Sequence, residues 1–131
     1  MEIKDLISRA KSAKKRAYAP YSGFRVGAAL LTREGKVYTG CNIELSSYSL
    51  TICAERVALF KAISEGEREF EAMVVLSDSE TLCPPCGPCR QVMWEFGGDM
   101  KVILANPKGE YITTSVRDLL PEAFDKGFLE V

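Results

Sequence analysis

The 131-residue chain contains no histidine, the side chain that most often binds metals and carries protons near neutral pH. Any metal site must therefore use other ligands, such as cysteine thiolates. Its 17 Lys and Arg residues nearly balance 18 Asp and Glu residues, and its densest basic group, within residues 11–16, is typical of a solvated helix face. Nucleic acids are held through many phosphate contacts, so we expect no nucleic-acid partner and a small-molecule ligand instead.

Long apolar stretches are also missing. No segment approaches the ~20 residues that span a bilayer, so we expect no membrane partner. The first residues, Met1-Glu2-Ile3-Lys4-Asp5, do not resemble a signal peptide. Five cysteines are an odd number, which argues against a closed disulfide framework. These features predict a cytoplasmic protein, in which reduced thiols are available for metal or redox chemistry.

The hydrophobic pattern predicts one α/β domain over residues 1–131. The chain is 47% hydrophobic, enough for a real core. We expect helices over about 5–18, 53–64, 89–96 and 116–124, the last interrupted at Pro121, and strands over 25–32, 36–42, 72–77, 101–105 and 110–113. This order predicts a three-layer α/β/α sandwich with a mixed central sheet of about five strands.

Three cysteines and a glutamate stand in two short motifs, Cys53-Ala54-Glu55 and Pro85-Cys86-Gly87-Pro88-Cys89. Two cysteines three residues apart can place both sulfurs ~2.3 Å from one Zn²⁺ ion, and Cys53 would supply a third. Three protein ligands leave one tetrahedral position open, as in catalytic zinc sites. Glu55 stands beside that position as a proton carrier. The motifs match the H-x-E…P-C-x-x-C signature of zinc-dependent nucleobase deaminases, with cysteine in place of histidine.

Both clusters lie where helices are predicted to begin, and free N–H groups at a helix N-terminus stabilise thiolates. Zn²⁺ with three thiolates carries a net charge of −1, which weakens its pull on bound water. We therefore expect an offsetting donor, and we assign Arg56 as a donor to a thiolate sulfur. An ordinary surface position remains open for Arg56, and equally for Arg90, which follows the second cluster.

The cysteines permit two other interpretations. Cys83 would add a fourth sulfur and close the site, giving a noncatalytic, zinc-stapled interaction domain. Two prolines stiffen the spacer between Cys83 and Cys86, however, and Glu55 would have no task there. The sequence Cys86-Gly87-Pro88-Cys89 is also the C-G-P-C motif of thioredoxin-like oxidoreductases, but that interpretation leaves Cys53 and Glu55 unexplained.

Over nearly its whole length the chain resembles the small, homotetrameric cytidine deaminases that bind zinc through cysteines alone. The resemblance rests on five segments in the family's order: APYSGFRVGAA at 19–29, GCNIE at 40–44, CAER at 53–56, PCGPCRQ at 85–91 and LLPEAF at 119–124. Two segments depart from the family pattern. Leu45 stands where an asparagine is common, and residues 125–131 match nothing in it.

The resemblance implies that Cys53, Cys86 and Cys89 bind one Zn²⁺ per subunit and that Glu55 is the catalytic proton shuttle. The implied reaction is hydrolytic deamination of cytidine, and of deoxycytidine, to uridine or deoxyuridine and ammonia. Zinc-bound hydroxide would attack C4 of the cytosine ring.

The resemblance also implies a nucleoside site. Asn42 and Glu44 would hydrogen-bond the ribose, a role that suits an amide and an acceptor at a strand end. Phe24 would pack against the pyrimidine, although the sequence alone favours a core position for it. The remaining substrate contacts would be Ala54, Tyr48 and Phe124, the last two at active sites shared between subunits of a homotetramer. A modified cytosine nucleoside such as blasticidin S is the alternative substrate.

Overall fold

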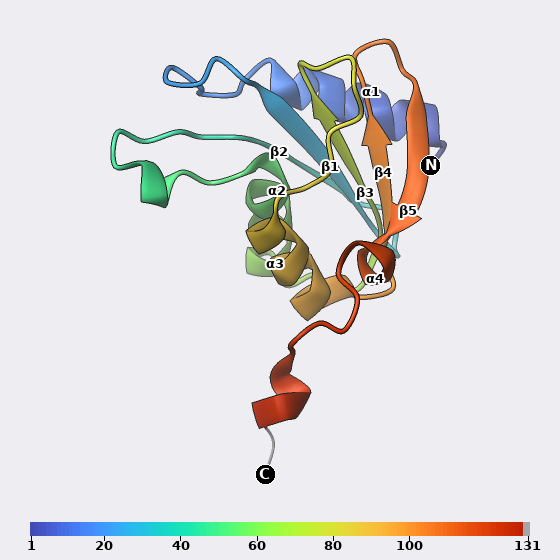
Figure 1. Ribbon diagram of the computed structural model, residues 1–131. Coiled ribbons are helices and arrows are strands. Elements are labelled where there is room, and N and C mark those ends of the chain that lie inside the picture. Colours follow the sequence, from blue (N-terminus) through green and yellow to red (C-terminus); the bar gives the residue numbers. More distant parts are fainter. Residues whose placement is uncertain (130–131) are drawn as a thin grey trace.

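The computed structural model describes residues 1–129, which form a five-stranded sheet with the strand order β2-β1-β3-β4-β5 (Figure 1). Strands β1 and β3 are antiparallel, as are the outer pairs β1–β2 and β4–β5, whereas β3 and β4 are parallel. The predicted mixed sheet is confirmed. The strands are β1 (Val26–Thr32), β2 (Val37–Cys41), β3 (Phe70–Ser77), β4 (Lys101–Ala105) and β5 (Tyr111–Ser115).

Helices cover both faces of this sheet, which confirms the predicted three-layer arrangement (Figure 1). Helix α1 packs on one face, and α2 and α3 lie side by side on the other. The helices are α1 (Ile3–Lys14), α2 (Ala54–Ser64), α3 (Gly87–Gly97) and the short α4 (Val116–Leu119), with 3-10 turns η1 (Tyr48–Leu50) and η2 (Lys126–Leu129). Among the described residues, no helix is long and apolar enough to cross a membrane.

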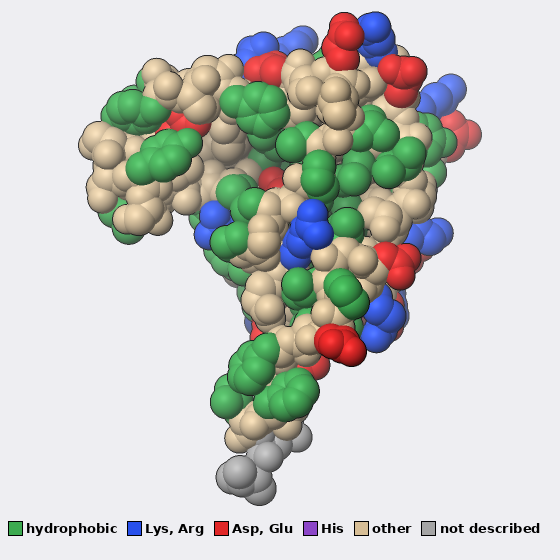
Figure 2. Space-filling model, in the orientation of Figure 1, with side chains coloured by type: hydrophobic (Ala, Val, Ile, Leu, Met, Phe, Trp, Pro, Cys, Tyr) green, Lys and Arg blue, Asp and Glu red, His purple; other side chains and the backbone are tan. Residues whose placement is uncertain are grey.

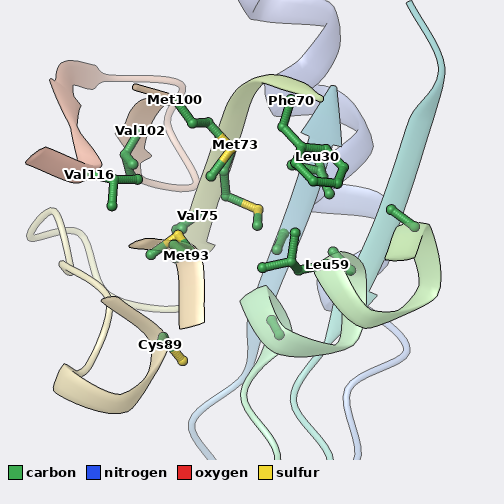
Figure 3. Close-up of a cluster of buried hydrophobic side chains, with 14 of the residues drawn as sticks. Leu30, Leu59, Phe70, Met73, Val75, Cys89, Met93, Met100, Val102 and Val116 are labelled. Carbon is green, nitrogen blue, oxygen red and sulfur yellow. The ribbon is translucent and has the colours of Figure 1, made fainter. Parts of the chain in front are cut away.

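The core is divided by the sheet into two clusters whose residues alternate along each strand. On β3, Met73 and Val75 join the cluster beneath α2 and α3 (Figure 3), whereas Val74 faces α1. Both Met73 and Val74 have no exposed surface. The run of apolar residues in β3 is therefore a central strand buried on both faces. Cys89 also belongs to the first cluster, so one sulfur of the predicted metal site is anchored directly in the core (Figure 3).

Two helices end earlier than their sequence patterns predict. Helix α1 stops at Lys14 rather than near Tyr18, because the Tyr18 backbone pairs with another segment: its N–H donates to the Asn42 carbonyl at 2.9 Å. The last predicted helix ends at Leu119, since Pro121 lacks an N–H group and Glu122 has a positive φ of 53°. Tertiary pairing and backbone chemistry thus override the local helical pattern.

Helix α2 lies unusually close to β2, and a glycine makes this possible. A Cβ atom on Gly40 would lie only 2.5 Å from the backbone nitrogen of Ala58 and would also collide with the Ala54 carbonyl. The absence of a side chain at Gly40 therefore lets the start of α2 pack directly against β2. That start carries the first of the two cysteine motifs.

Candidate metal centre and active site

Two helix N-termini bring three cysteine sulfurs together. Cys53 is the N-cap of α2, Cys86 is the N-cap of α3, and Cys89 lies in the first turn of α3. The sulfur of Cys86 is 3.6 Å from that of Cys53 and 3.3 Å from that of Cys89, and all three lie within 4.8 Å of one another. Sulfurs ~2.3 Å from a tetrahedral zinc ion are ~3.8 Å apart, so this cluster fits Zn²⁺.

The fourth cysteine of this region, Cys83, does not belong to the cluster. Its sulfur lies 3.7 Å from the carbonyl oxygen of Pro84. Three sulfurs rather than four thus converge, and the arrangement matches a site with one position left for a small ligand rather than a closed structural site.

The protonation of the Cys53 and Cys89 thiols also favours a cation. A hydrogen bond from Cys89 is the main reason that the pKa of Cys53 falls to about 5, and the Arg56 guanidinium assists against the opposing effect of burial. Donating that bond, together with burial, raises the pKa of Cys89 far above its ordinary value. One proton is thus retained so that a neighbour can be negative. A cation bound by Cys53 and Cys89 would take the place of that proton.

Arg56 lies one helical turn after Cys53 and points at its sulfur. The guanidinium Nη2 atom is 3.4 Å from Cys53 Sγ, and this hydrogen bond is the main cause that raises the pKa of Arg56. Arg90 takes a different position. It donates to the carbonyl oxygens of Pro85 at 2.9 Å and Leu119 at 2.8 Å, so it joins the loop before α3 to the end of α4.

Glu55 occupies the first turn of α2 and is almost completely buried, with 4% of its surface exposed. Burial raises the pKa of its carboxyl group to about 7, and the negative charge of Cys53 acts in the same direction. A group with a pKa near neutrality can both accept and release a proton at physiological pH. Glu55 therefore has the properties of a general base and acid.

A cavity of about 270 Å³ opens next to the sulfur cluster and Glu55. Its walls are partly apolar, from Val26, Ile52 and Val75, and its polar groups converge from several elements. Most of the residues that the sequence singled out line it: Phe24, Asn42, Glu44, Tyr48, Cys53, Ala54, Glu55 and Cys86. A mostly apolar hollow with a few convergent polar groups is typical of a small-molecule site.

Asn42 and Glu44 line this cavity and also hold the segment that forms its rim. Asn42 accepts a hydrogen bond from the Val26 N–H at 2.9 Å and donates one to the Phe24 carbonyl at 2.8 Å. Glu44 accepts from the N–H groups of Tyr21 and Ser22 at 3.0 Å each, and from the Ser22 hydroxyl. The hydrogen bond from that hydroxyl is the main cause that lowers the pKa of Glu44, so this carboxylate is charged at neutral pH.

The structure does not bring Phe124 to this cavity. Its side chain is 57% exposed on the segment after α4, its ring is stacked on Phe128 with centroids 5.4 Å apart, and its carbonyl accepts from Gln91 Nε2 at 2.7 Å. Tyr48 lies at the cavity and is 59% exposed. Both residues thus present large surfaces to the outside of the chain.

Sequence reasoning did not place several residues of the cavity wall, among them the polar residue Ser22 and the thiol Cys83. The Ser22 hydroxyl accepts from the Phe24 N–H at 3.0 Å and donates to Glu44, so it links the rim to the polar wall. A serine two residues before Phe24 in a Pro-Tyr-Ser-Gly turn is a known local signal for such a side-chain turn. For Cys83, the two prolines before Cys86 argue against a fourth metal ligand, but no feature of the sequence indicates a place in the cavity wall.

The chain is similar to known proteins in sequence and in structure. Residues 1–106 match the family described as the cytidine and deoxycytidylate deaminase zinc-binding region. A cytidine deaminase of Sporosarcina psychrophila is 54% identical over 127 residues, which are 96% of this chain and 93% of that protein. A cytidine deaminase of Burkholderia pseudomallei, solved by crystallography, superimposes with a TM-score of 0.92 at 51% identity, over 95% of this chain and 100% of the other.

A blasticidin-S deaminase of Bacillus cereus is a more distant relative. It is 31% identical over 104 residues, covering 73% of this chain and 74% of that protein. The family match, the coverage and the shared fold agree with the geometry of the sulfur cluster. The chain belongs to the cytidine and deoxycytidylate deaminase family and carries that family's zinc-binding region.

Proposed function

We propose that this chain is a zinc-dependent cytidine deaminase that converts cytidine, and deoxycytidine, to uridine or deoxyuridine and ammonia. The observation that carries the proposal is the placement of Glu55, a buried carboxyl group with a pKa raised to about 7, at one cavity with the three-cysteine cluster. The similarity to cytidine deaminases over nearly the full chain supports it.

Cys53, Cys86 and Cys89 would hold one Zn²⁺ per chain, which as a Lewis acid lowers the pKa of water and makes it nucleophilic near pH 7. Glu55 would accept the proton of the attacking water and deliver it to ring nitrogen N3 as the C4–O bond forms. The same carboxyl group would then take the proton of the new hydroxyl on C4 and transfer it to the amino group, which leaves as ammonia when the C4–N bond breaks and the C4 carbonyl forms. One carboxyl group can serve both steps because its pKa is close to the working pH.

The other cavity residues would bind and orient the nucleoside. The Phe24 ring, 39% exposed at the cavity, would stack on the pyrimidine, an interaction worth about 1–3 kcal/mol per base. The carboxylate of Glu44 and the amide of Asn42 would take the ribose hydroxyls, and Ala54 would contact the base. We assign Arg56 to stabilising the negative charge of the cysteine ligands through Cys53.

A modified cytosine nucleoside such as blasticidin S is the alternative substrate. It is the substrate named for a distant relative, whereas relatives with half or more identical residues are named for cytidine. Glu44 and Asn42 both line the cavity and together offer hydrogen-bond acceptors and a donor, which favours a substrate with an intact ribose.

We further propose that residues 1–131 act as one domain in a homotetramer with shared active sites. Large apolar side chains are exposed on η1 and on the segment after α4, including Tyr48, Leu50, Phe124 and Phe128. Figure 2 shows apolar side chains on the projecting C-terminal segment. Such surfaces usually mark interfaces. Light scattering on the purified protein tests the assembly. We place the protein in the cytoplasm, where the thiols stay reduced, and in pyrimidine salvage.

Ammonia release from cytidine by the zinc-loaded protein tests the activity, with Glu55→Gln and blasticidin S alongside. We expect the parent to release ammonia from cytidine and Glu55→Gln to keep its zinc while kcat falls about 10²–10⁴-fold, the usual contribution of general acid–base catalysis. Near-normal turnover by Glu55→Gln would refute its role. A zinc-loaded parent that acts on blasticidin S and not on cytidine would replace the proposed substrate.

A further inference from the structure

The cavity rim that carries Phe24 belongs to no helix or strand and depends on side chains for its position. Residues 19–25 lie between α1 and β1, and Gly23 has a positive φ of 68°. Within this segment the backbone forms one turn bond, from the Gly23 N–H to the Ala19 carbonyl at 3.0 Å. Most of the remaining anchors of the rim are contacts with polar side chains of other elements, so the loss of one anchor should alter the rim.

Three acidic or amide side chains provide these anchors. Glu44 holds the backbone of Tyr21 and Ser22, and Asn42 holds the carbonyl of Phe24 from the cavity side. The third is Asp78, which follows β3 and lies outside the cavity lining. The contacts of Asp78 with Arg25, the residue after Phe24, are the most extensive of the three.

Asp78 forms hydrogen bonds with both the backbone and the side chain of Arg25. Its Oδ2 atom accepts from the Arg25 N–H at 2.9 Å and from Arg25 Nε at 3.1 Å, and its Oδ1 atom accepts from Arg25 Nη2 at 3.1 Å. The Asp78 N–H in turn donates to the Arg25 carbonyl at 3.1 Å. Paired guanidinium–carboxylate bonds of this kind fix orientation as well as distance.

Lys14 fixes the carboxylate of Asp78 from the other side. Its ammonium group lies 2.8 Å from Asp78 Oδ1, and its side chain, at the end of α1, is only 9% exposed. Helix α1 itself is pressed against β1, where a Cβ on Gly27 would lie 2.7 Å from the Lys14 backbone nitrogen. The Asp78 carboxylate is therefore held by a well-packed helix, and Arg25 is held by Asp78.

We propose that Asp78, fixed by Lys14, is a positioning residue for the nucleoside site: through Arg25 it sets the place of the Phe24 ring at the cavity. The inference rests on the proposed function for its effect on substrate. Asp78 has no contact with the cavity, so it acts through the rim and not on the reacting atoms. Substitution of Asp78 should weaken nucleoside binding while the chemical step, which depends on Glu55 and the cysteine cluster, is preserved.

The test compares Asp78→Asn with the control variant Asp99→Asn. The Asp99 carboxylate also pairs with an arginine, since it accepts a hydrogen bond from Arg117 at 2.8 Å. Asp99 and Arg117 are far from the rim in sequence and do not line the cavity. We expect Asp78→Asn to raise KM for cytidine about tenfold, within the range of one stacking contact, with kcat within about twofold of the parent. Asp99→Asn should leave both constants unchanged. An unchanged KM in Asp78→Asn would overturn the proposal.

A double-mutant comparison with Phe24→Ala shows whether the effect passes through the ring. If it does, adding Asp78→Asn to Phe24→Ala should raise KM by less than about twofold further, since coupled sites are not additive. If the KM of the double mutant rises by the product of the two single-mutant increases, the proposal is overturned. Should Asp78→Asn fail to fold because Lys14 loses its partner, Arg25→Met keeps the Lys14–Asp78 pair and should raise KM in the same way.

Amide hydrogen exchange of residues 21–26 separates this proposal from the proposed activity. In Asp78→Asn or Arg25→Met these amides should exchange about tenfold faster than in the parent, because local opening becomes easier. Unchanged exchange would overturn the positioning role even if the enzyme is active. If the parent releases no ammonia from cytidine, but the two variants still show faster amide exchange in residues 21–26, the proposed function is refuted and the positioning role of Asp78 is not.

Discussion

The guanidinium of Arg56 donates to the sulfur of Cys53 at 3.4 Å, from one turn further along the same helix. Because residues three apart lie on one face of a helix, a ligand and its donor can be supplied by the motif Cys53-Ala54-Glu55-Arg56 alone. Glu55, between them, is directed to the cavity. Four consecutive residues therefore provide a candidate metal ligand, a cavity wall, a proton carrier and a positive charge.

We expect Arg56→Gln to lower kcat/KM, or zinc affinity, about 10–100-fold, the usual effect of removing a group that hydrogen-bonds a metal ligand. Without the guanidinium, the charge of three thiolates is less well compensated. Steady-state kinetics and zinc titration against a chelator measure both quantities. Arg90→Gln is the matched control, since Arg90 binds two carbonyl oxygens and no sulfur. It should lower Tm and leave zinc affinity near the parent value. Equal behaviour of the two variants would contradict the role of Arg56.

Zinc should be bound by three sulfurs and one lighter atom. X-ray absorption on the zinc-loaded protein should give three sulfur neighbours at ~2.3 Å, and a fourth sulfur would contradict the open site. Cys86→Ser should lose tight zinc binding, whereas Cys83→Ser should keep one zinc per chain, because Cys83 lies outside the cluster. Removal of zinc by a chelator should abolish activity and lower Tm, and one equivalent of added zinc should restore both.

Asp78 should make the folded state sensitive to acid. Burial opposes its ionisation, but the ion pairs with Lys14 and Arg25 prevail and lower its pKa from 3.8 to about 2. A carboxyl group with a depressed pKa in the folded state contributes its full stability above the pKa of the unfolded chain, and this contribution is lost as the pH falls through the folded value. The difference in Tm between the parent and Asp78→Asn should therefore be constant above about pH 5 and narrow toward about pH 2. A difference independent of pH would contradict this account.

Gly40→Ala should disturb both stability and the metal centre. The added methyl group would collide with the α2 backbone at Ala54 and Ala58, and such overpacking costs about 1–3 kcal/mol of unfolding free energy. Because α2 begins at Ala54, directly after Cys53, we also expect weaker zinc binding. Gly98→Ala is the control: its Cβ would meet Trp94 at an ordinary 3.4 Å, so it should change stability by less than about 0.5 kcal/mol. Denaturant unfolding and zinc titration measure the two effects.

The local sequence was sufficient to predict those helices and strands that are specified by a repeating side-chain pattern or by a short turn. The apolar run of β3 and the hairpin of β1 and β2 follow from side-chain alternation and turn chemistry. The sulfur cluster was also foreseeable, because a C-x-x-C spacing at a helix start dictates that two sulfurs converge. The interruption of the last helix was foreseeable from Pro121, whereas the end of α1 at Lys14 was not, since it depends on the pairing of Tyr18 with Asn42, a residue far along the chain.

By itself, then, the sequence determined the order of helices and strands, the three convergent sulfurs and the carboxyl group beside them. The tertiary structure alone decided how deeply Glu55 is buried, and hence the pKa of Glu55. It also decided that Asn42, Glu44 and Asp78 hold one rim from three sides. The physical reason is the distance along the chain over which each effect acts. Helix caps, the alternation of apolar and polar residues in strands, and the spacing of metal ligands depend on a few neighbouring residues. The desolvation of a carboxyl group and the anchoring of a loop depend on groups that only folding brings together.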